Sequence, residues 1–323
     1  MSSQRDVFLT RLFERAQEDK DIYLISVDMG AASLDRWREE LPDQFFAAGI
    51  SEQNAINFAA GLSATGKKVY VYFMACWVAR CFEQLRYSCA IANNAITILG
   101  NGVALGYAPA GPAHNPTEDM AYMRSLCGIE IYSPANVAIT EKLVDLTCDE
   151  PKFRYIRLER KYPAKLDELS SGVVVASESL QNGLYTIKPE PAAIERPPKD
   201  KKVCILSSGY MLGRAIDVAE KLLSAGYEVG IVDLWRVKPI NSELFEQAVS
   251  PYDLLVTIEE QTLFGGFGSA VAEKATDLSL GKEILRIGLP EYYIFRNGDR
   301  EHLLNENGLS VKSIYGKIKA RLT

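Results

Sequence analysis

Short apolar segments that alternate with helical segments constrain the fold of this 323-residue chain most strongly. Three strand-like runs, at residues 22–27, 67–73 and 95–100, are mainly apolar, and helical spacing occupies 51–65 and 77–92. Strands that are apolar on both faces are typical of parallel sheets with helices on either side. The sequence therefore predicts an α/β fold.

The alternation breaks once, between residues 161 and 200, where five prolines and many charges occur. Such composition is typical of a linker, here with room for a small hairpin. The strand and helix pattern restarts at Val203. We therefore expect two domains, 1–165 and 201–323, joined by a linker at 166–200. Each domain should be a mostly parallel sheet flanked by helices.

Charge and hydropathy exclude several classes of protein. The formal net charge of −6 argues against nucleic-acid binding, which needs a basic face. The first 20 residues contain no apolar signal core, and the sequence contains no run of 18 apolar residues. From these patterns we expect a cytoplasmic protein that binds neither nucleic acid nor membrane.

The stretch FAAGISEQNAINFAAGL (46–62) places Glu52 at a helix start among small apolar residues. One interpretation is structural: Ser51 caps the helix, and an acid in the first turn meets its positive end. The other is catalytic. Small neighbours favour a buried helix, and a carboxyl group with little water around it has its neutral form favoured. Such a group can give and take a proton near neutral pH.

Three further side chains lie where buried strands end, which is the edge at which ligands bind to open α/β sheets. His114 sits in a loop rich in proline and glycine, so it is either a surface residue or a positioned proton carrier. Phe73 and Trp77 are either core residues or a flat platform for a heterocycle. The sequence has no phosphate-binding P-loop motif and no G-x-S-x-G motif. We identify no metal-ligating set.

The order of several motifs resembles the transketolase family. LISVDMG, FFAAGISEQNAINFAAGLSATGKKVYVYF, GPAHNPTEDMAYMRSL and YIRLER are similar to its pyrimidine-binding half, and TIEEQTLFGGFGSAVAE and RIGLPEYY to its C-terminal domain. The resemblance spans nearly the whole chain and is closest to the short subunit of split transketolases. Deoxyxylulose-phosphate synthases are also similar. The β-subunits of 2-oxoacid dehydrogenases rank lower, because HNPT replaces their usual His-Ser-Gln-Ser.

The resemblance implies thiamine diphosphate as cofactor. Glu52 matches the family glutamate that bonds the pyrimidine nitrogen and so helps generate the ylid nucleophile. Trp77, with Phe73, falls where the family has the aromatic that stacks on the pyrimidine, although tryptophan replaces the usual phenylalanine. The resemblance also implies that Arg80 is one of the cofactor-binding residues. The cofactor supplies the electron sink, and the protein supplies geometry and a tuned proton.

The resemblance also implies substrate contacts. His114, in GPAH, matches a histidine that contacts the substrate and moves protons. Arg160 matches an arginine that holds a terminal phosphate, and Arg5 and Ser33 resemble further phosphate contacts. Ala110 replaces an aspartate that many relatives use to contact sugar hydroxyls, which puts the usual sugar-phosphate preference in doubt.

The Gly-Asp-Gly motif that binds Mg²⁺ and diphosphate is absent from the sequence. We therefore expect a partner subunit to hold Mg²⁺ and the diphosphate, most simply in an α₂β₂ assembly. The predicted reaction transfers a two-carbon ketol unit from a ketose or ketose phosphate to an aldehyde. The alternatives are a carboligase or dehydrogenase component acting on a 2-oxoacid, and a scaffolding subunit without chemistry. Retention of both Glu52 and His114 speaks against the scaffold.

Overall fold

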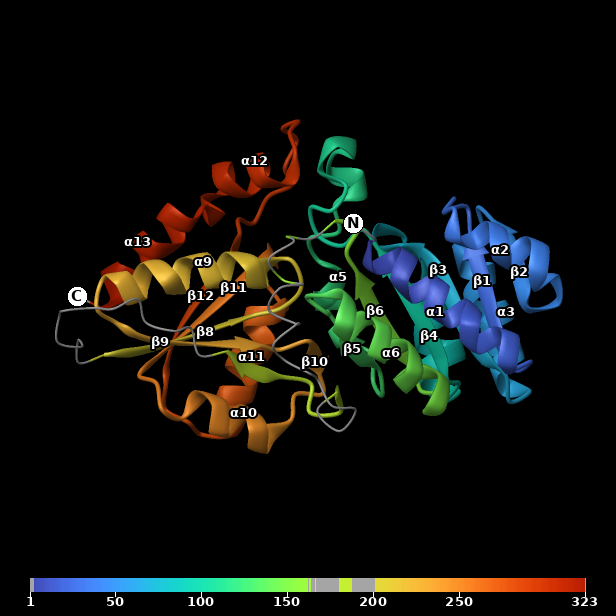
Figure 1. Ribbon diagram of the computed structural model, residues 1–323, viewed down its shortest axis with the longest axis horizontal. Coiled ribbons are helices and arrows are strands. Elements are labelled where there is room, and N and C mark those ends of the chain that lie inside the picture. Colours follow the sequence, from blue (N-terminus) through green and yellow to red (C-terminus); the bar gives the residue numbers. More distant parts are fainter. Residues whose placement is uncertain (1–2, 162, 164–165, 167–179, 188–200, 323) are drawn as a thin grey trace.

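The computed structural model describes residues 3–161, 163, 166, 180–187 and 201–322. Within these residues the chain forms a seven-stranded sheet and a five-stranded sheet, side by side along the long axis of the molecule (Figure 1). Helices cover both faces of each sheet. This arrangement confirms the predicted α/β fold class.

The first sheet has the strand order β10-β5-β6-β4-β3-β1-β2. Its strands are β1 (Ile22–Val27), β2 (Phe45–Gly49), β3 (Lys68–Met74), β4 (Ile96–Asn101), β5 (Glu130–Tyr132), β6 (Arg154–Leu158) and β10 (Arg236–Lys238). All pairings are parallel except that of β10 with β5. The central strands are buried along nearly their whole length, because helices cover both faces.

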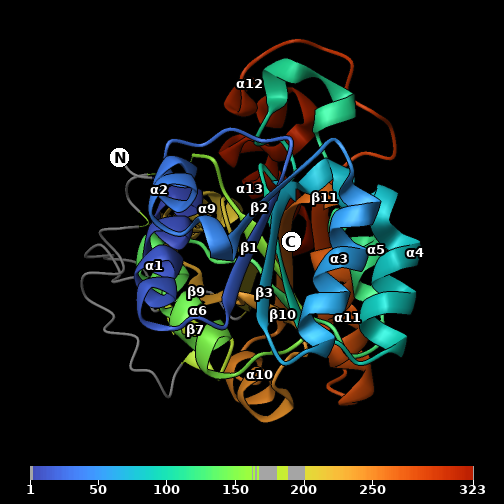
Figure 2. The ribbon, with the colours of Figure 1, turned by 90° about the vertical axis from the view of Figure 1, so that its right-hand side faces the viewer.

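Two helical layers enclose this sheet (Figure 2). On one face lie α1 (Gln4–Glu18), α2 (Ser33–Glu40) and α6 (Val137–Asp149). On the other face lie α3 (Glu52–Ala64), α4 (Phe82–Gln84) and α5 (Asp119–Arg124). Residues 77–92, predicted as one helix, instead form a 3₁₀ segment, η2 (Ala75–Cys81), then α4 and a π-helical turn, η3 (Leu85–Ile91).

The second sheet has the order β12-β11-β8-β9-β7. Its strands are β7 (Tyr185–Ile187), β8 (Lys202–Ser207), β9 (Glu228–Asp233), β11 (Leu254–Thr262) and β12 (Glu283–Leu289). Its helices are α9 (Met211–Ser224), α10 (Ser242–Val249), α11 (Phe267–Asp277), α12 (Arg300–Leu304) and α13 (Val311–Leu322). Helices α9 and α13 lie on one face, and α10 and α11 lie on the other (Figure 1).

The two halves of the molecule are joined by a strand that crosses into the first sheet and by a common hydrophobic core. Strand β10 follows β9 in sequence but joins the first sheet, and Met120 and Met123 of α5 share one core cluster with Phe267 of α11. Strand β7 lies inside the segment predicted as a linker and pairs antiparallel with β9. Most of that segment lies outside the described residues, so the domain limits at 165 and 201 stay a prediction.

Among the described residues, no helix combines the length and the apolar character that crossing a bilayer requires.

Candidate active site

Four predicted residues meet at one edge of the first sheet. Because neighbouring parallel strands end at the same edge, the segments that follow β2, β3 and β4 come together there. Helix α3 begins after β2 with Glu52, η2 follows β3 with Trp77 and Arg80, and the loop after β4 carries His114. The sequence separates these residues by up to 62 positions, and the topology reunites them.

Glu52 is the first residue of α3 and is 4% exposed. Its helix can lie close to the sheet because its inward face is made of small or branched apolar residues, among them Ala55, Ile56 and Ala59. The Ser51 hydroxyl does not cap the helix and instead donates to the carbonyl oxygen of Ala48 at 2.6 Å. The predicted capping bond from the Ser51 side chain is therefore absent.

Arg80 links the acid to the indole. Its Nη1 donates to Glu52 Oε2 at 2.9 Å, and its guanidinium carbon lies 4.9 Å from the centre of the Trp77 ring. Residues three apart eclipse one another in a 3₁₀ helix, which explains how η2 stacks Arg80 on Trp77. The Arg80 side chain is 47% exposed, so this ion pair is open to solvent on one side.

His114 stands against the other side of Trp77. The two ring centres are 5.6 Å apart at 67°, an edge-to-face contact. His114 Nδ1 is buried without a hydrogen-bond partner among the described residues, and so are both amide atoms of Asn115. Buried polar atoms of this kind are rare, and those that occur call for an explanation. They can bond a ligand at this edge.

Phe73 lies apart from this group. It is fully buried and belongs to the core cluster under α3, whereas Trp77 is only half-buried. Of the two predicted aromatics, only Trp77 therefore presents a ring to Arg80 and His114.

A buried ion pair joins α5, the helix that follows the His114 loop, to strand β6. Asp119 of α5 accepts two hydrogen bonds from Arg157 at 2.8 and 3.0 Å and one from the Tyr155 hydroxyl at 2.7 Å. Arg157 and Tyr155 belong to β6. Burial opposes the charge of Arg157, but Asp119 raises its pKa above the usual range. This pair fastens the end of the loop to the sheet.

Two of the three predicted phosphate contacts, Arg5 and Ser33, belong to α1 and α2, which cover the opposite face of the sheet. Arg5 donates through Nε and Nη2 to the carboxylate of Asp6, each at 2.9 Å. Ser33, the first residue of α2, donates to the same carboxylate at 3.3 Å. The structure thus brings Arg5 and Ser33 together, with an acid between them.

Arg160 follows β6 at the same edge and is exposed. Its guanidinium carbon lies 5.0 Å from the ring centre of Tyr107, whose hydroxyl accepts a hydrogen bond from Asn101 at 2.9 Å. Gln4 Oε1 accepts a hydrogen bond from the backbone N–H of Glu159 at 2.9 Å. This bond brings the start of α1 beside Arg160.

Sequence reasoning missed Asp6, Asn101, Tyr107 and Asn115. Asp6 and Asn115 follow predicted residues directly, and Tyr107 lies in the same glycine-rich loop as His114. Asp6 and Asn115 are therefore recognisable as polar neighbours of predicted residues. Tyr107 is recognisable only by its loop, and Asn101 only as the polar end of a buried strand.

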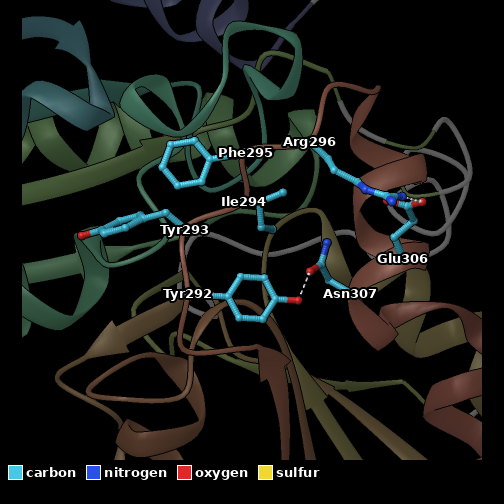
Figure 3. A pocket seen from close by; sticks show the side chains of 7 residues that line it. All are labelled: Tyr292, Tyr293, Ile294, Phe295, Arg296, Glu306 and Asn307. Atoms are coloured by element: carbon cyan, nitrogen blue, oxygen red, sulfur yellow. Dashed lines mark hydrogen bonds and ion pairs between the residues drawn. The ribbon is translucent and has the colours of Figure 1, made fainter.

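A cavity of about 450 Å³ lies over the loop after β12 (Figure 3). Its polar groups are mostly paired with one another. The Tyr292 hydroxyl donates to Asn307 at 2.9 Å, and Arg296 pairs with Glu306. None of the predicted site residues lines it.

Nothing among the described residues forms a cluster of His, Cys, Asp or Glu suited to a metal ion. The stretch NGDR at residues 297–300, which contains a Gly-Asp pair, has structural roles. Asp299 accepts from the backbone of His302 at 2.8 Å, and Arg300 pairs with Glu159 and Glu260.

Comparison with known families accords with this arrangement. The family described as transketolase, pyrimidine binding domain, matches residues 2–163, and the family described as transketolase, C-terminal domain, matches residues 192–314.

Individual relatives agree with the family matches. A subunit of the apulose-4-phosphate transketolase of Phocaeicola vulgatus is 29% identical over 97% of this chain and 96% of its own length. The 1-deoxy-D-xylulose-5-phosphate synthase of Nitrosomonas europaea is 30% identical over 98% of this chain, which spans only 48% of that protein. A solved structure described as a split gene transketolase, inactive beta4 tetramer, superposes with a TM-score of 0.78, at 27% identity and over 99% of this chain and 98% of that one.

Proposed function

The chain belongs to the transketolase family, and we propose that it is the activating subunit of a split, thiamine-diphosphate-dependent transketolase. It transfers a two-carbon ketol unit from a ketose to an aldehyde together with a second subunit. The observation that carries this proposal is the buried Glu52 at a helix start, beside Trp77, Arg80 and His114.

The residues fit the pyrimidine end of the cofactor. Arg80 engages Glu52 Oε2, and no described group donates to Oε1, so one oxygen is left for the ring nitrogen. Trp77 offers a half-buried indole for stacking, a role for which Phe73 lacks any exposed surface. When bound, thiamine diphosphate supplies a carbon nucleophile and an electron sink. Glu52 holds the proton at the ring nitrogen, and Trp77 orients the ring.

His114 serves the substrate. Its unpartnered Nδ1 and the unpartnered amide of Asn115 are buried at the same edge, where they can bond a carbonyl or hydroxyl oxygen. An imidazole held against Trp77 can accept and return a proton without losing its position. Its role differs from that of Glu52, because it acts on the substrate and not on the cofactor.

The partner chain supplies the remainder of the site. Two relatives, one named as a subunit of a transketolase and one as a split gene transketolase, support a second chain. In the proposal that chain holds Mg²⁺ and the diphosphate, and the two chains form an α₂β₂ assembly. The cytoplasmic location expected from the sequence stays a prediction.

A second candidate is a carboligase that decarboxylates a 2-oxoacid before joining it to an aldehyde. The similarity to a 1-deoxy-D-xylulose-5-phosphate synthase over 98% of this chain favours it. The same Glu52 and His114 would serve, so geometry does not separate the two reactions. The donor does, because only a 2-oxoacid releases carbon dioxide.

The test mixes the chain with a candidate partner carrying the Gly-Asp-Gly motif, and screens ketoses and 2-oxoacids as donors with an aldehyde acceptor. We expect ketol transfer without carbon dioxide, and loss of activity by a factor of at least ~100 in Glu52→Gln. Carbon dioxide release would favour the second candidate. Unchanged turnover by the Glu52→Gln variant would remove Glu52 from the mechanism.

A further inference from the structure

The Asp6 carboxylate accepts hydrogen bonds from two residues that the sequence predicts as phosphate contacts. It accepts the two-pronged bond from Arg5, a bond from Ser33 and a bond of 2.6 Å from the Ser3 hydroxyl. Two of these donors, Arg5 and Ser33, are predicted phosphate contacts. An internal anion therefore already satisfies both.

A structural role accounts for only part of this arrangement. Ser3 is the N-cap of α1, and its hydroxyl accepts from the backbone N–H of Asp6 at 3.2 Å while donating to the Asp6 carboxylate. Capping explains neither the fork from Arg5 nor the bond from Ser33, which comes from another helix. Asp6 thus has contacts beyond those that a helix start requires.

The Asp6 carboxylate is ionised at neutral pH. Burial raises its pKa, but the bonds from Arg5 and from the two serine hydroxyls lower it more, so the pKa lies below its usual range. Its side chain is 34% exposed, so it can also accept a bond from a bound molecule.

The charge balance at this end of the site is consequently small. Arg5 and Asp6 cancel, and the third predicted phosphate contact, Arg160, lies over the Tyr107 ring. A phosphate ester would bring two negative charges next to the Asp6 carboxylate. A hydroxyl group would instead donate a hydrogen bond to that carboxylate.

We propose that Asp6 is a specificity-determining residue that makes the site favour substrates with an uncharged, hydroxyl-bearing far end over phosphate esters. This inference rests on the proposed function and names its substrate class. Like charges at contact distance repel each other even near a protein surface, so removing the Asp6 charge should alter the choice of substrate about tenfold.

The experiment compares Asp6→Asn with the wild type in the assembled complex. A free ketohexose and its 6-phosphate ester serve as donors, with one uncharged aldehyde as acceptor, and the ratio of the two kcat/KM values is measured. We expect the wild type to use the free sugar at least as well as the ester. In Asp6→Asn the ratio should move toward the ester about tenfold.

Glu14→Gln is the matched control, because Glu14 lies on the same helix and pairs with Arg11 on the exposed surface. It changes the net charge equally and should leave the ratio unaltered. A wild type that favours the ester more than tenfold, or an Asp6→Asn ratio equal to that of the wild type, overturns the proposal. Asp6→Ser replaces Asp6→Asn if the latter does not fold, since serine also suits a helix start.

Calorimetric titration of the full chain with inorganic phosphate separates this proposal from the proposed function. Saturable binding should be absent in the wild type and present in Asp6→Asn. Phosphate binding by the wild type that is lost in Arg5→Ala would contradict the role of Asp6. If no donor of either kind is turned over, the proposed function fails, and the titration still decides the role of Asp6.

Discussion

Two buried glutamates, one at each sheet, have opposite surroundings. Glu52 and Glu260 are 4% and 3% exposed, and each pairs with an arginine. The partner of Glu52, Arg80, donates one hydrogen bond to the acid and is 47% exposed. The partner of Glu260, Arg300, is 11% exposed, binds Glu159 as well, and lies 3.6 Å from the ring centre of Tyr210.

The difference shows that a buried acid paired with arginine does not by itself mark an active site. At the second sheet Arg300 pairs with both carboxylates, those of Glu159 and Glu260. At the first sheet one oxygen of Glu52 has no donor among the described residues, and unpartnered atoms of His114 and Asn115 lie at the same edge. We therefore interpret the first pair as functional and the second as structural.

Removing Arg300 should have the largest effect on stability. Arg300→Met leaves Glu159 and Glu260 as two buried carboxylates without a cation, which costs about 3–5 kcal/mol of unfolding free energy. Urea denaturation measures this loss. Arg80→Met, the matched change at the first sheet, should cost less, about 1–3 kcal/mol, because it removes one hydrogen bond from a single buried carboxylate and the lost cation is itself 47% exposed. Equal losses in the two variants would erase the distinction.

His114→Asn sharpens the comparison through activity. The substitution keeps a polar side chain but removes the proton carrier, so kcat/KM of the assembled enzyme should fall about 10²–10³-fold. Cofactor affinity, measured by titration calorimetry, should stay within twofold. The other histidine, His302, is exposed on α12, and His302→Asn serves as the control. A large change in cofactor affinity in His114→Asn would show that His114 binds the cofactor and not the substrate.

Glu259, a buried acid of the second sheet, should make the stability of the protein depend on pH. Burial raises the pKa of Glu259 to about 7, although backbone N–H groups of Phe267 and Gly268 donate to it. An acid whose pKa is raised by folding stabilises the protein below its unfolded pKa of 4.5, and this contribution is lost as pH rises through 7.

We therefore expect the free energy of unfolding to fall by on the order of 2 kcal/mol from this group between pH 4.5 and 7.5. In Glu259→Gln this part of the slope should disappear in denaturation curves recorded at several pH values. An identical slope in wild type and variant would show that the two backbone bonds keep Glu259 ionised.

The smallest effect distinguishes the two aromatics. Trp77→Leu should weaken thiamine diphosphate binding to the assembled complex about tenfold, the loss of one stacking contact, and leave the unfolding free energy nearly unaltered. Phe73→Leu should do the reverse, with a loss of about 1–2 kcal/mol in stability and unaltered binding, because Phe73 is a core residue. Weaker cofactor binding in Phe73→Leu, with unaltered binding in Trp77→Leu, would assign the stacking role to Phe73.

The apolar runs and the helical spacing of residues 51–65 predict three strands of the first sheet, β1, β3 and β4, and the helix α3, because burial determines those patterns. The same spacing predicts one helix at 77–92, where the structure has 3₁₀ and π turns. That irregularity places Arg80 on Trp77, and hydrophobic periodicity does not encode it.

Tertiary contacts account for the other differences. The crossing of β10 into the first sheet and the role of Asp6 depend on pairings between distant segments. Ser51 has the composition of a helix cap, yet its hydroxyl turns back to Ala48 after a glycine in the left-handed region. Trp77 and His114 could be predicted because each follows a predicted strand, and Glu52 because small apolar residues surround it at a helix start.

The central claim is that Glu52 activates the cofactor while the acids of the second sheet do not. Hydrogen–deuterium exchange at the thiazolium C2 of thiamine diphosphate, followed by proton NMR in the assembled complex, tests it most directly. We predict that Glu52→Gln slows this exchange by at least ~100-fold and that Glu260→Gln leaves it within twofold. Exchange as fast in Glu52→Gln as in the wild type would contradict the account.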